Sequence, residues 1–193
     1  MKMSVKRMFV WLRRIRHVRG FGVQSPSAYR FIRYVINEHY PYYAYSDLKD
    51  CSGVLTNNEL RLYRLYFRLS NYMQASTWVD CCTNSDDVVR KYINSGSVNT
   101  QYVHCSSVSS VSTFDVLRVN SNELDDEGYE HLLSLASSHS MLIVEGIYSN
   151  KCSKQMWKKV VSDERTGITY DLYDCGLVFF DKKKYKQNYI VNF

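Results

Sequence analysis

Seven short apolar runs follow one another along the chain after residue 73. Stretches with helical periodicity separate several of them, at residues 85–93, 123–136 and 153–161, and Trp157 lies on the apolar side of the last stretch. Strands that alternate with helices are typical of an α/β fold with a largely parallel sheet. The runs that we predict to be strands are residues 77–82, 101–105, 114–119, 141–144, 168–173, 177–180 and 189–193.

The predicted sheet departs from a regular parallel order in two places. Only eight residues join Cys105 to Phe114, whereas a parallel crossover usually needs about a dozen or more. We therefore expect the sheet to be trimmed on that side. Near the end of the chain, Cys175 and Gly176 separate the last strands too tightly for a helix, which predicts an antiparallel C-terminal element.

The first segment of the chain has the pattern of a basic amphipathic helix. Val5, Met8, Leu12 and Ile15 recur at helical spacing, with basic residues around them, and a pair of glycines follows. We expect this apolar face to pack on apolar surface while the arginines stay in water. Burial of such large side chains contributes more than exposed arginines do.

Two further helices are predicted before residue 74. Ser25 and Pro26 form a start signal, a capping side chain followed by a residue that has no N–H to lose. Thr56 and Glu59 have the spacing of a capping box at the start of the next helix. The arginines that we expect on the exposed side of that helix are Arg61, Arg64 and Arg68.

Length and composition suit one folding unit. The 193 residues, 45% of them hydrophobic, supply a core of ordinary size. We predict a helical extension over residues 1–73 that packs on an α/β domain over residues 74–193. No apolar run approaches the roughly 20 residues that cross a bilayer, which favours a cytoplasmic protein without a transmembrane segment.

The positive charge belongs to the N-terminal arm. Residues 1–37 hold nine basic side chains and no acid, whereas the remaining residues carry 16 basic against 19 acidic side chains, a net charge of −3. Two interpretations of the arm stay open. It contacts RNA or an anionic membrane, or it packs on the domain or on a second subunit of a homo-oligomer with a solvated basic face.

The six cysteines show no regular spacing and lie mostly in apolar runs, so we expect them to be reduced and buried. Cys81, Cys82, His104 and Cys105 raise two hypotheses, a metal site and a catalytic Cys–His pair. Neither C-x-x-C nor H-x-x-x-H spacing supports the first, and nothing in the spacing orients a base for the second. We favour structural thiols and predict no metal.

Three segments resemble a family of proteins. They are RGFGVQSPSAYRF, then LYFRLSNYMQASTWVDCCTNSDD, and finally MLIVEGIYSNKCSKQMWKKV together with ITYDLYDCGLVFFDKKKYKQNYIVNF. The chain resembles the class I S-adenosylmethionine-dependent methyltransferases, in particular small bacterial members with an H-G-[VI]-H-S-P-F opening. The resemblance implies a Rossmann-like fold with S-adenosylmethionine as cofactor. Because the family sheet has seven strands and residues 106–113 hold no room for a helix, strand and helix, we expect fewer than seven here.

The resemblance places the cofactor-binding positions at Asp80, Cys82, Thr83, His104, Asn120 and Glu145. Several of these positions depart from the family. Cys82 and Asp86 stand where glycines let the backbone approach the cofactor, and His104 stands where an acid binds the ribose. Asn120 replaces an aspartate, and only Asp80 keeps the acid of the first strand.

The last acidic motif of the family is altered as well. Glu145 holds the first acid of a D-D pair, Gly146 replaces the second, and Tyr148 replaces a histidine. We expect Asp80 and Glu145 to lie at the carboxyl ends of neighbouring strands, where open α/β sheets bind ligands. The alternative is that both are ordinary strand-end carboxylates, solvated or capping a helix.

The sequence therefore predicts a methyltransferase-like protein with a degenerate cofactor site that binds S-adenosylmethionine weakly or not at all. An active enzyme would use Asp80 and Glu145 near the cofactor, with a methyl transfer that needs mainly positioning; its acceptor is not identified. The alternative is a non-catalytic interaction protein that binds a partner, RNA or an anionic membrane through its basic arm.

Overall fold

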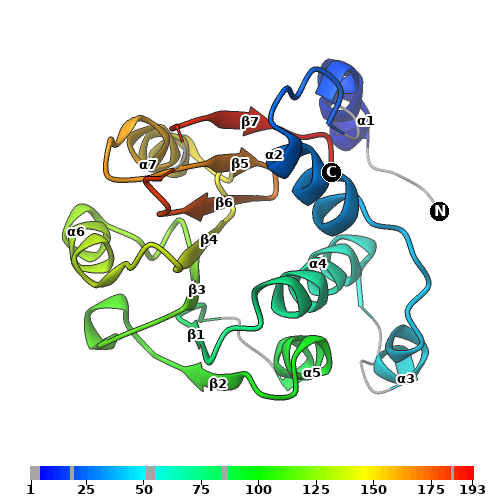
Figure 1. Ribbon diagram of the computed structural model, residues 1–193, viewed down its shortest axis with the longest axis horizontal. Coiled ribbons are helices and arrows are strands. Elements are labelled where there is room, and N and C mark those ends of the chain that lie inside the picture. Colours follow the sequence, from blue (N-terminus) through cyan, green and yellow to red (C-terminus); the bar gives the residue numbers. More distant parts are fainter. Residues whose placement is uncertain (1–4, 18–19, 51–54, 84–86, 184) are drawn as a thin grey trace.

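The computed structural model describes residues 5–17, 20–50, 55–83, 87–183 and 185–193. A seven-stranded sheet forms the middle of three layers, with α4 and α5 on one face and α6 and α7 on the other (Figure 1). Its strands are β1 (Thr77–Asp80), β2 (Gln101–His104), β3 (Val116–Asn120), β4 (Met141–Glu145), β5 (Thr169–Asp171), β6 (Cys175–Phe179) and β7 (Asn188–Ile190).

The strand order is β2-β1-β3-β4-β6-β5-β7. The first four of these strands are parallel, β6 is antiparallel to both β4 and β5, and β7 lies parallel to β5 at the far edge. The expected α/β fold with an antiparallel C-terminal element is confirmed.

The expectation of fewer than seven strands is wrong. Between β2 and β3 the chain forms only the short 3-10 helix η3 (Val108–Ser110), as the short interval predicted. The sheet has an additional strand at its opposite edge, because the residues after β6 form β7, which pairs with β5. The count therefore stays at seven although one side is trimmed.

The α4 face of the sheet carries the larger apolar core. α2 (Pro26–Phe31) runs into the π-helix η2 (Ile32–Ile36), which packs beside α4 (Asn57–Met73), and α4 packs on α5 (Asp87–Gly96). A further helix, α3 (Ala44–Asp50), was not predicted. Because this core contains side chains from α2, η2 and α4 as well as from the strands, these three helices share one core with the sheet. The division at residue 73 stays a prediction.

The start signals of these helices are confirmed. The Ser25 hydroxyl accepts a hydrogen bond from the Ala28 N–H, and Thr56 and Glu59 form a reciprocal capping box at the start of α4. The expected exposed arginine stripe is wrong at Arg68, which is buried and donates to the carbonyl oxygens of Val35 and Ile36. These carbonyls end a helix, where a cation is stabilised.

The opposite face is covered by α6 (Asp126–Leu135) and α7 (Lys151–Ser162). The Trp157 side chain is buried, as its position on the apolar side predicted. It packs on the backbone of β6 at Gly176, where a Cβ atom would lie 2.3 Å from the indole ring. The close approach of α7 to the sheet therefore requires glycine at this position.

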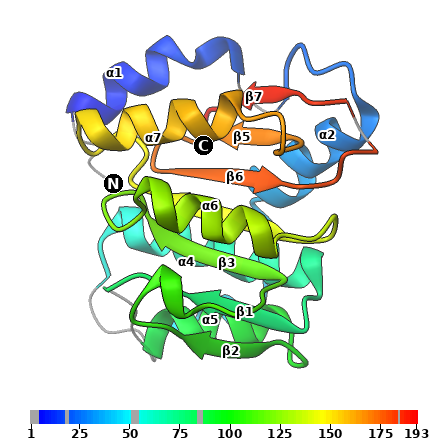
Figure 2. The same cartoon turned by 90° about the vertical axis from the view of Figure 1, so that its left-hand side faces the viewer.

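The N-terminal arm forms α1 (Val5–Arg13) and the 3-10 helix η1 (Ile15–His17), which lie beyond the β7 edge of the sheet (Figure 2). The expectation that the apolar face packs inward is wrong for Met8, Leu12 and Ile15, which are exposed; the Val5 side chain lies outside the described residues. Arg14 turns inward instead, and its guanidinium pairs with Asp171 at 2.9 Å.

The cysteines are less uniformly buried than expected. Cys81, Cys82 and Cys175 are buried free thiols, Cys105 is half-buried and Cys152 is exposed, while Cys51 lies outside the described residues. Burial raises the pKa of the Cys81 thiol to about 12, with Cys105 and Asp80 raising it further. The thiol is therefore protonated at neutral pH, which disfavours a nucleophilic role. Within the described residues, no group of three or more candidate ligands could hold a metal ion.

Candidate functional site

A buried cluster of charges lies on the α4 face of the sheet, at the carboxyl ends of β1 and β4. Its centre is Arg118 of β3, whose Nη1 lies 2.6 Å from Asp80 Oδ2 and whose Nε lies 2.6 Å from Glu145 Oε1. Asp80 is completely buried and Arg118 is 3% exposed. One guanidinium therefore binds both carboxylates that the sequence singled out.

The sheet register brings these three side chains together. Asp80 lies opposite Arg118 in the pairing of β1 with β3, and Glu145 lies opposite Asn120 in the pairing of β3 with β4. The expectation that Asp80 and Glu145 come from neighbouring strands is wrong, because β3 lies between β1 and β4. Alternation along β3 places Arg118 on the α4 face, while Leu117 and Val119 join the core of the other face.

Two tyrosines complete the hydrogen bonding of the carboxylates. Tyr66 of α4 donates to Glu145 Oε1, and its ring lies 5.2 Å from the guanidinium carbon of Arg118. Tyr102 of β2 donates to Asp80 Oδ2 at 2.7 Å. The Cys82 N–H donates to the other Asp80 oxygen at 3.0 Å. Asp80 thus has several donors and one cation around it, as a buried carboxylate requires.

The protonation states of the cluster follow from its burial. Burial, reinforced by the nearby Glu145 carboxylate, raises the pKa of Tyr66 well above its usual value, so the phenol stays protonated and donates. Burial by itself lowers the pKa of the Arg118 guanidinium. Tyr66, Glu145, Cys82 and Asp80 outweigh it, so the pKa lies well above its usual value. Arg118 therefore stays charged at neutral pH.

The turn after β1 also differs from a cofactor-binding loop. Cys82, at a position where the resemblance expects glycine, carries a side chain that is 2% exposed. Burial raises the pKa of its thiol. Thr83 is exposed and donates through its N–H and hydroxyl to Glu123. Asp86, the second position where glycine is expected, lies outside the described residues.

The remaining predicted positions lie near the cluster but do not join it. His104 is exposed at the end of β2, opposite Asp80 in the pairing of β1 with β2. The Asn120 side chain accepts a hydrogen bond from the Asn122 N–H at 3.0 Å and so stabilises the turn after β3. The structure thus brings Asp80, Cys82 and Glu145 together and leaves Thr83, His104 and Asn120 at the rim.

The turn after β4 is built on backbone conformation and an aromatic pair. Gly146 has a φ of +66°, a conformation that favours glycine. The rings of Tyr148 and Tyr173 stack at 5.3 Å, and Arg14 lies over both of them. Tyr148 donates to Asp171, the carboxylate that Arg14 also binds. Tyr148, at the position where the resemblance expects a histidine, therefore helps to hold the N-terminal arm against the sheet.

Sequence reasoning missed Arg118, Tyr66 and Tyr102. A signal for the first was present, because Arg118 is a charged residue between Leu117 and Val119 in the apolar run FDVLRV, which was predicted to be a strand. A charge at such a position is almost never buried without a partner. The two strand-end acids were the nearest available partners.

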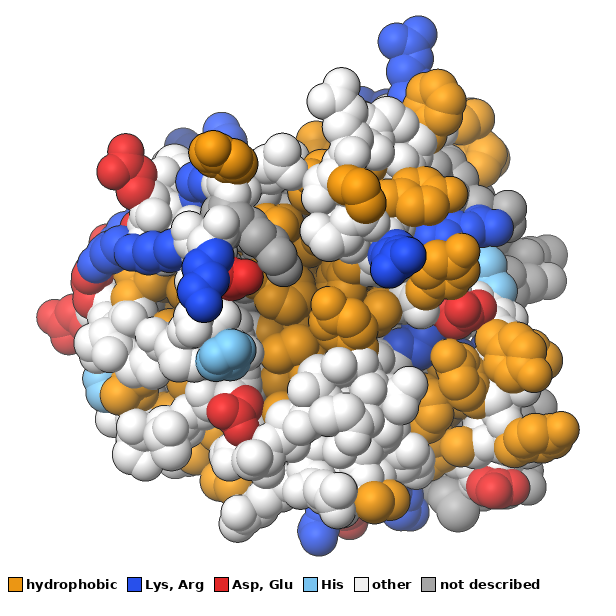
Figure 3. All heavy atoms as spheres, viewed as in Figure 1, with side chains coloured by type: hydrophobic (Ala, Val, Ile, Leu, Met, Phe, Trp, Pro, Cys, Tyr) orange, Lys and Arg blue, Asp and Glu red, His pale blue; other side chains and the backbone are white. Residues whose placement is uncertain are grey.

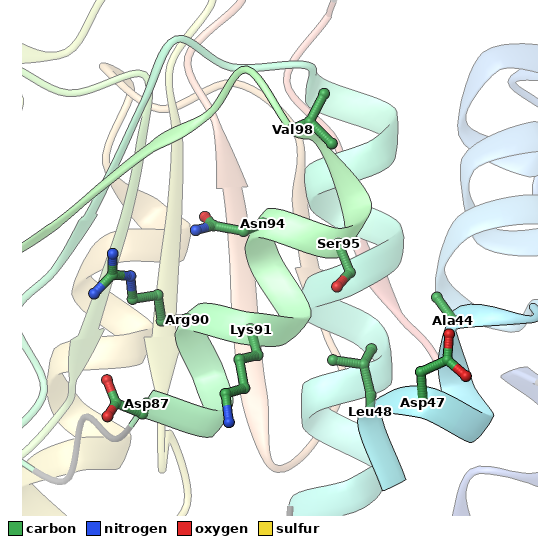
Figure 4. A pocket seen from close by; sticks show the side chains of 9 residues that line it. All are labelled: Ala44, Asp47, Leu48, Asp87, Arg90, Lys91, Asn94, Ser95 and Val98. Atoms are coloured by element: carbon green, nitrogen blue, oxygen red, sulfur yellow. The ribbon is translucent and has the colours of Figure 1, made fainter. Parts of the chain in front are cut away.

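A separate pocket of about 600 Å³ opens between α3 and α5 (Figure 4). Asp87, Arg90 and Lys91 of α5 line it on one side, and Asp47 and Leu48 of α3 line it on the other. None of the six predicted cofactor positions belongs to its lining. This pocket is therefore distinct from the charge cluster at the strand ends.

The sequence matches no protein-family model and no curated protein. Similar solved structures exist. PaMTH1, a methyltransferase from Podospora anserina bound to S-adenosylhomocysteine, has a TM-score of 0.51 and 9% identity, over 81% of this chain and 96% of that chain. The O-methyltransferase TomG from Streptomyces achromogenes, in complex with S-adenosylmethionine, has a TM-score of 0.45 and 9% identity, over 73% of this chain and 91% of that one.

An O-methyltransferase from Bacillus cereus in complex with S-adenosylhomocysteine has a TM-score of 0.42 and 11% identity, over 76% of this chain and 94% of that chain. At such low identities a likeness concerns the fold alone, and the one to PaMTH1 is strong enough to carry that conclusion. The chain has the fold of the class I methyltransferases.

Proposed function

We propose that this chain is a methyltransferase-like protein in which an internal arginine binds the acidic side chains at the positions that the resemblance assigns to the cofactor. The observation that carries the proposal is the double ion pair of Arg118 with Asp80 and Glu145. The resemblance assigns both carboxylates to S-adenosylmethionine. Here each of them is bound by a buried cation that cannot lose its proton.

The other positions support the same conclusion. A ligand that approaches the backbone after β1 meets the buried Cys82 side chain instead of the space above a glycine. The ribose hydroxyls would meet His104, which offers no carboxylate. The residues present therefore do not fit S-adenosylmethionine.

Calorimetry with S-adenosylmethionine and S-adenosylhomocysteine tests the proposal, because the fold makes these the first ligands to try. We expect no saturable heat with either compound, since binding would have to displace Arg118 from two buried carboxylates. Micromolar binding of either compound by the unaltered protein would contradict the proposal.

A matched pair of variants sharpens this experiment. His104→Asp restores an acid at the second strand end, and His139→Asp adds the same charge at an exposed site after α6. We expect neither variant to bind, because Arg118 still holds Asp80 and Glu145. Binding by His104→Asp alone would mean that the ribose acid was the only part missing and that Arg118 is no obstacle.

A further inference from the structure

The outer face of the N-terminal arm is apolar and uncovered. The large hydrophobic side chains of α1 and η1 are between 42% and 60% exposed. Figure 3 shows hydrophobic side chains beside basic ones where this helix protrudes from the molecule. The exposed hydrophobic residues of the arm are Met8, Phe9, Trp11, Leu12 and Ile15.

This face is turned outward by the contacts on the opposite side of the arm. Arg14 binds the Asp171 carboxylate and the Asp171 carbonyl oxygen, and it stacks over the rings of Tyr148 and Tyr173. Asn192 near the chain end donates to the carbonyl oxygen of His17 at 3.0 Å. At 3.6 residues per turn, Met8 and Leu12 share one face, and that face lies roughly opposite Arg14.

The positive charge of the arm indicates which kind of surface could cover this apolar face. Residues 1–37 hold nine basic side chains and no acidic one. Arg13 and Arg16 are exposed beside the apolar face. A helix with aromatic and aliphatic residues on one side and basic residues around them is the kind that lies in the interface of an anionic bilayer. No helix in the described parts of the chain is long and apolar enough to span a membrane.

We propose that the arm docks the protein on an anionic lipid surface, with Met8, Trp11 and Leu12 among the acyl chains and the arginines at the headgroups. A second copy of the chain is a poorer occupant, because a symmetric contact would bring two basic arms together. RNA is also poorer. Phe9 and Trp11 offer stacking surface, but Met8, Leu12 and Ile15 on the same arm offer neither stacking surface nor hydrogen bonds.

The tryptophans of the chain provide a direct probe of this contact. Trp78 and Trp157 are buried, so a change of tryptophan emission on vesicle binding reports mainly on Trp11. We expect a blue shift and co-sedimentation with vesicles of phosphatidylcholine and phosphatidylserine. Pure phosphatidylcholine vesicles should bind the protein much more weakly, and salt should weaken the binding to the anionic ones.

Three variants separate the parts of the surface. Leu12→Gln with Ile15→Gln removes apolar surface and should weaken vesicle binding at least tenfold. Arg13→Gln with Arg16→Gln should weaken binding to anionic vesicles by up to about 30-fold, at roughly one kcal/mol for each basic residue near the surface. Val98→Gln removes an apolar side chain that is 89% exposed just after α5, away from the arm, and should change nothing.

Two results would overturn the proposal. One is equal binding to neutral and anionic vesicles, or no binding to either. The other is concentration-dependent dimerisation in ultracentrifugation that Leu12→Gln abolishes, which would assign the face to a second copy. All substituted side chains are exposed, so we expect each variant to keep the fold. Circular dichroism of each variant checks this.

Discussion

Replacing Arg118 by methionine is expected to lower the free energy of unfolding by about 3 to 5 kcal/mol, the usual cost of breaking a buried ion pair from one side. The substitution keeps most of the apolar volume but leaves Asp80 and Glu145 close together without a cation. Two carboxylates in one apolar site repel each other and lose solvation. Urea unfolding at neutral pH measures the change.

Arg165→Met is the matched control for this substitution. Arg165 also pairs with two carboxylates, Glu130 and Asp163, but its side chain is 49% exposed. Water replaces the lost partner there, so the substitution should change the stability far less. If Arg118→Met costs no more than Arg165→Met, the buried cluster does not hold its carboxylates in the way described.

The second large effect is expected from Gly96→Ala at the end of α5. A Cβ atom at Gly96 would lie 2.3 Å from the Phe67 carbonyl oxygen in α4 and 2.9 Å from the Ser70 Cβ. Backbone atoms cannot move aside as a flexible side chain can, so α4 and α5 must separate. Overpacking of this kind costs about 1 to 3 kcal/mol, and we expect the upper end of that range in thermal or urea unfolding.

The neighbouring residue gives the control. Ser95 belongs to the same helix but is exposed, so Ser95→Ala should leave the stability within about 0.5 kcal/mol of the original. A Gly96→Ala variant as stable as Ser95→Ala would show that the two helices do not approach as closely as the structure describes.

The strands could be predicted from the sequence because each is a short apolar run between polar turns. All seven predicted runs coincide with observed strands, with differences of a few residues at their ends. The helix starts at Ser25 and Thr56 were found because capping is a local interaction. The π-helical geometry of η2 and the helix α3 were missed, since neither has a local signal of that kind.

The order of the strands depends on distant pairing, and there the predictions failed in part. The strand count was misjudged because β7 pairs with β5 at the edge opposite the short β2–β3 connection. The orientation of the N-terminal arm also depends on contacts between residues that are distant in sequence. Periodicity identified the amphipathic helix, but its orientation is set by Arg14, Asp171 and Asn192, which are far apart in sequence.

The candidate site was predicted only in part for the same reason. Asp80 and Glu145 were found from their positions at strand ends, where such residues meet ligands. Their shared partner, Arg118, became evident only when the strand order placed β3 between them. Tyr66 enters from α4, and no spacing in the sequence relates it to Glu145.

Arg118 pairs with both carboxylates, Asp80 and Glu145, and we propose that they would otherwise face a ligand. A double-mutant cycle with Arg118→Met and Asp80→Asn, alone and combined, measures the coupling by urea unfolding. We predict that the combined variant loses less stability than the sum of the single ones, with a coupling of about 2 to 3 kcal/mol. Additivity within about 0.5 kcal/mol would contradict the account.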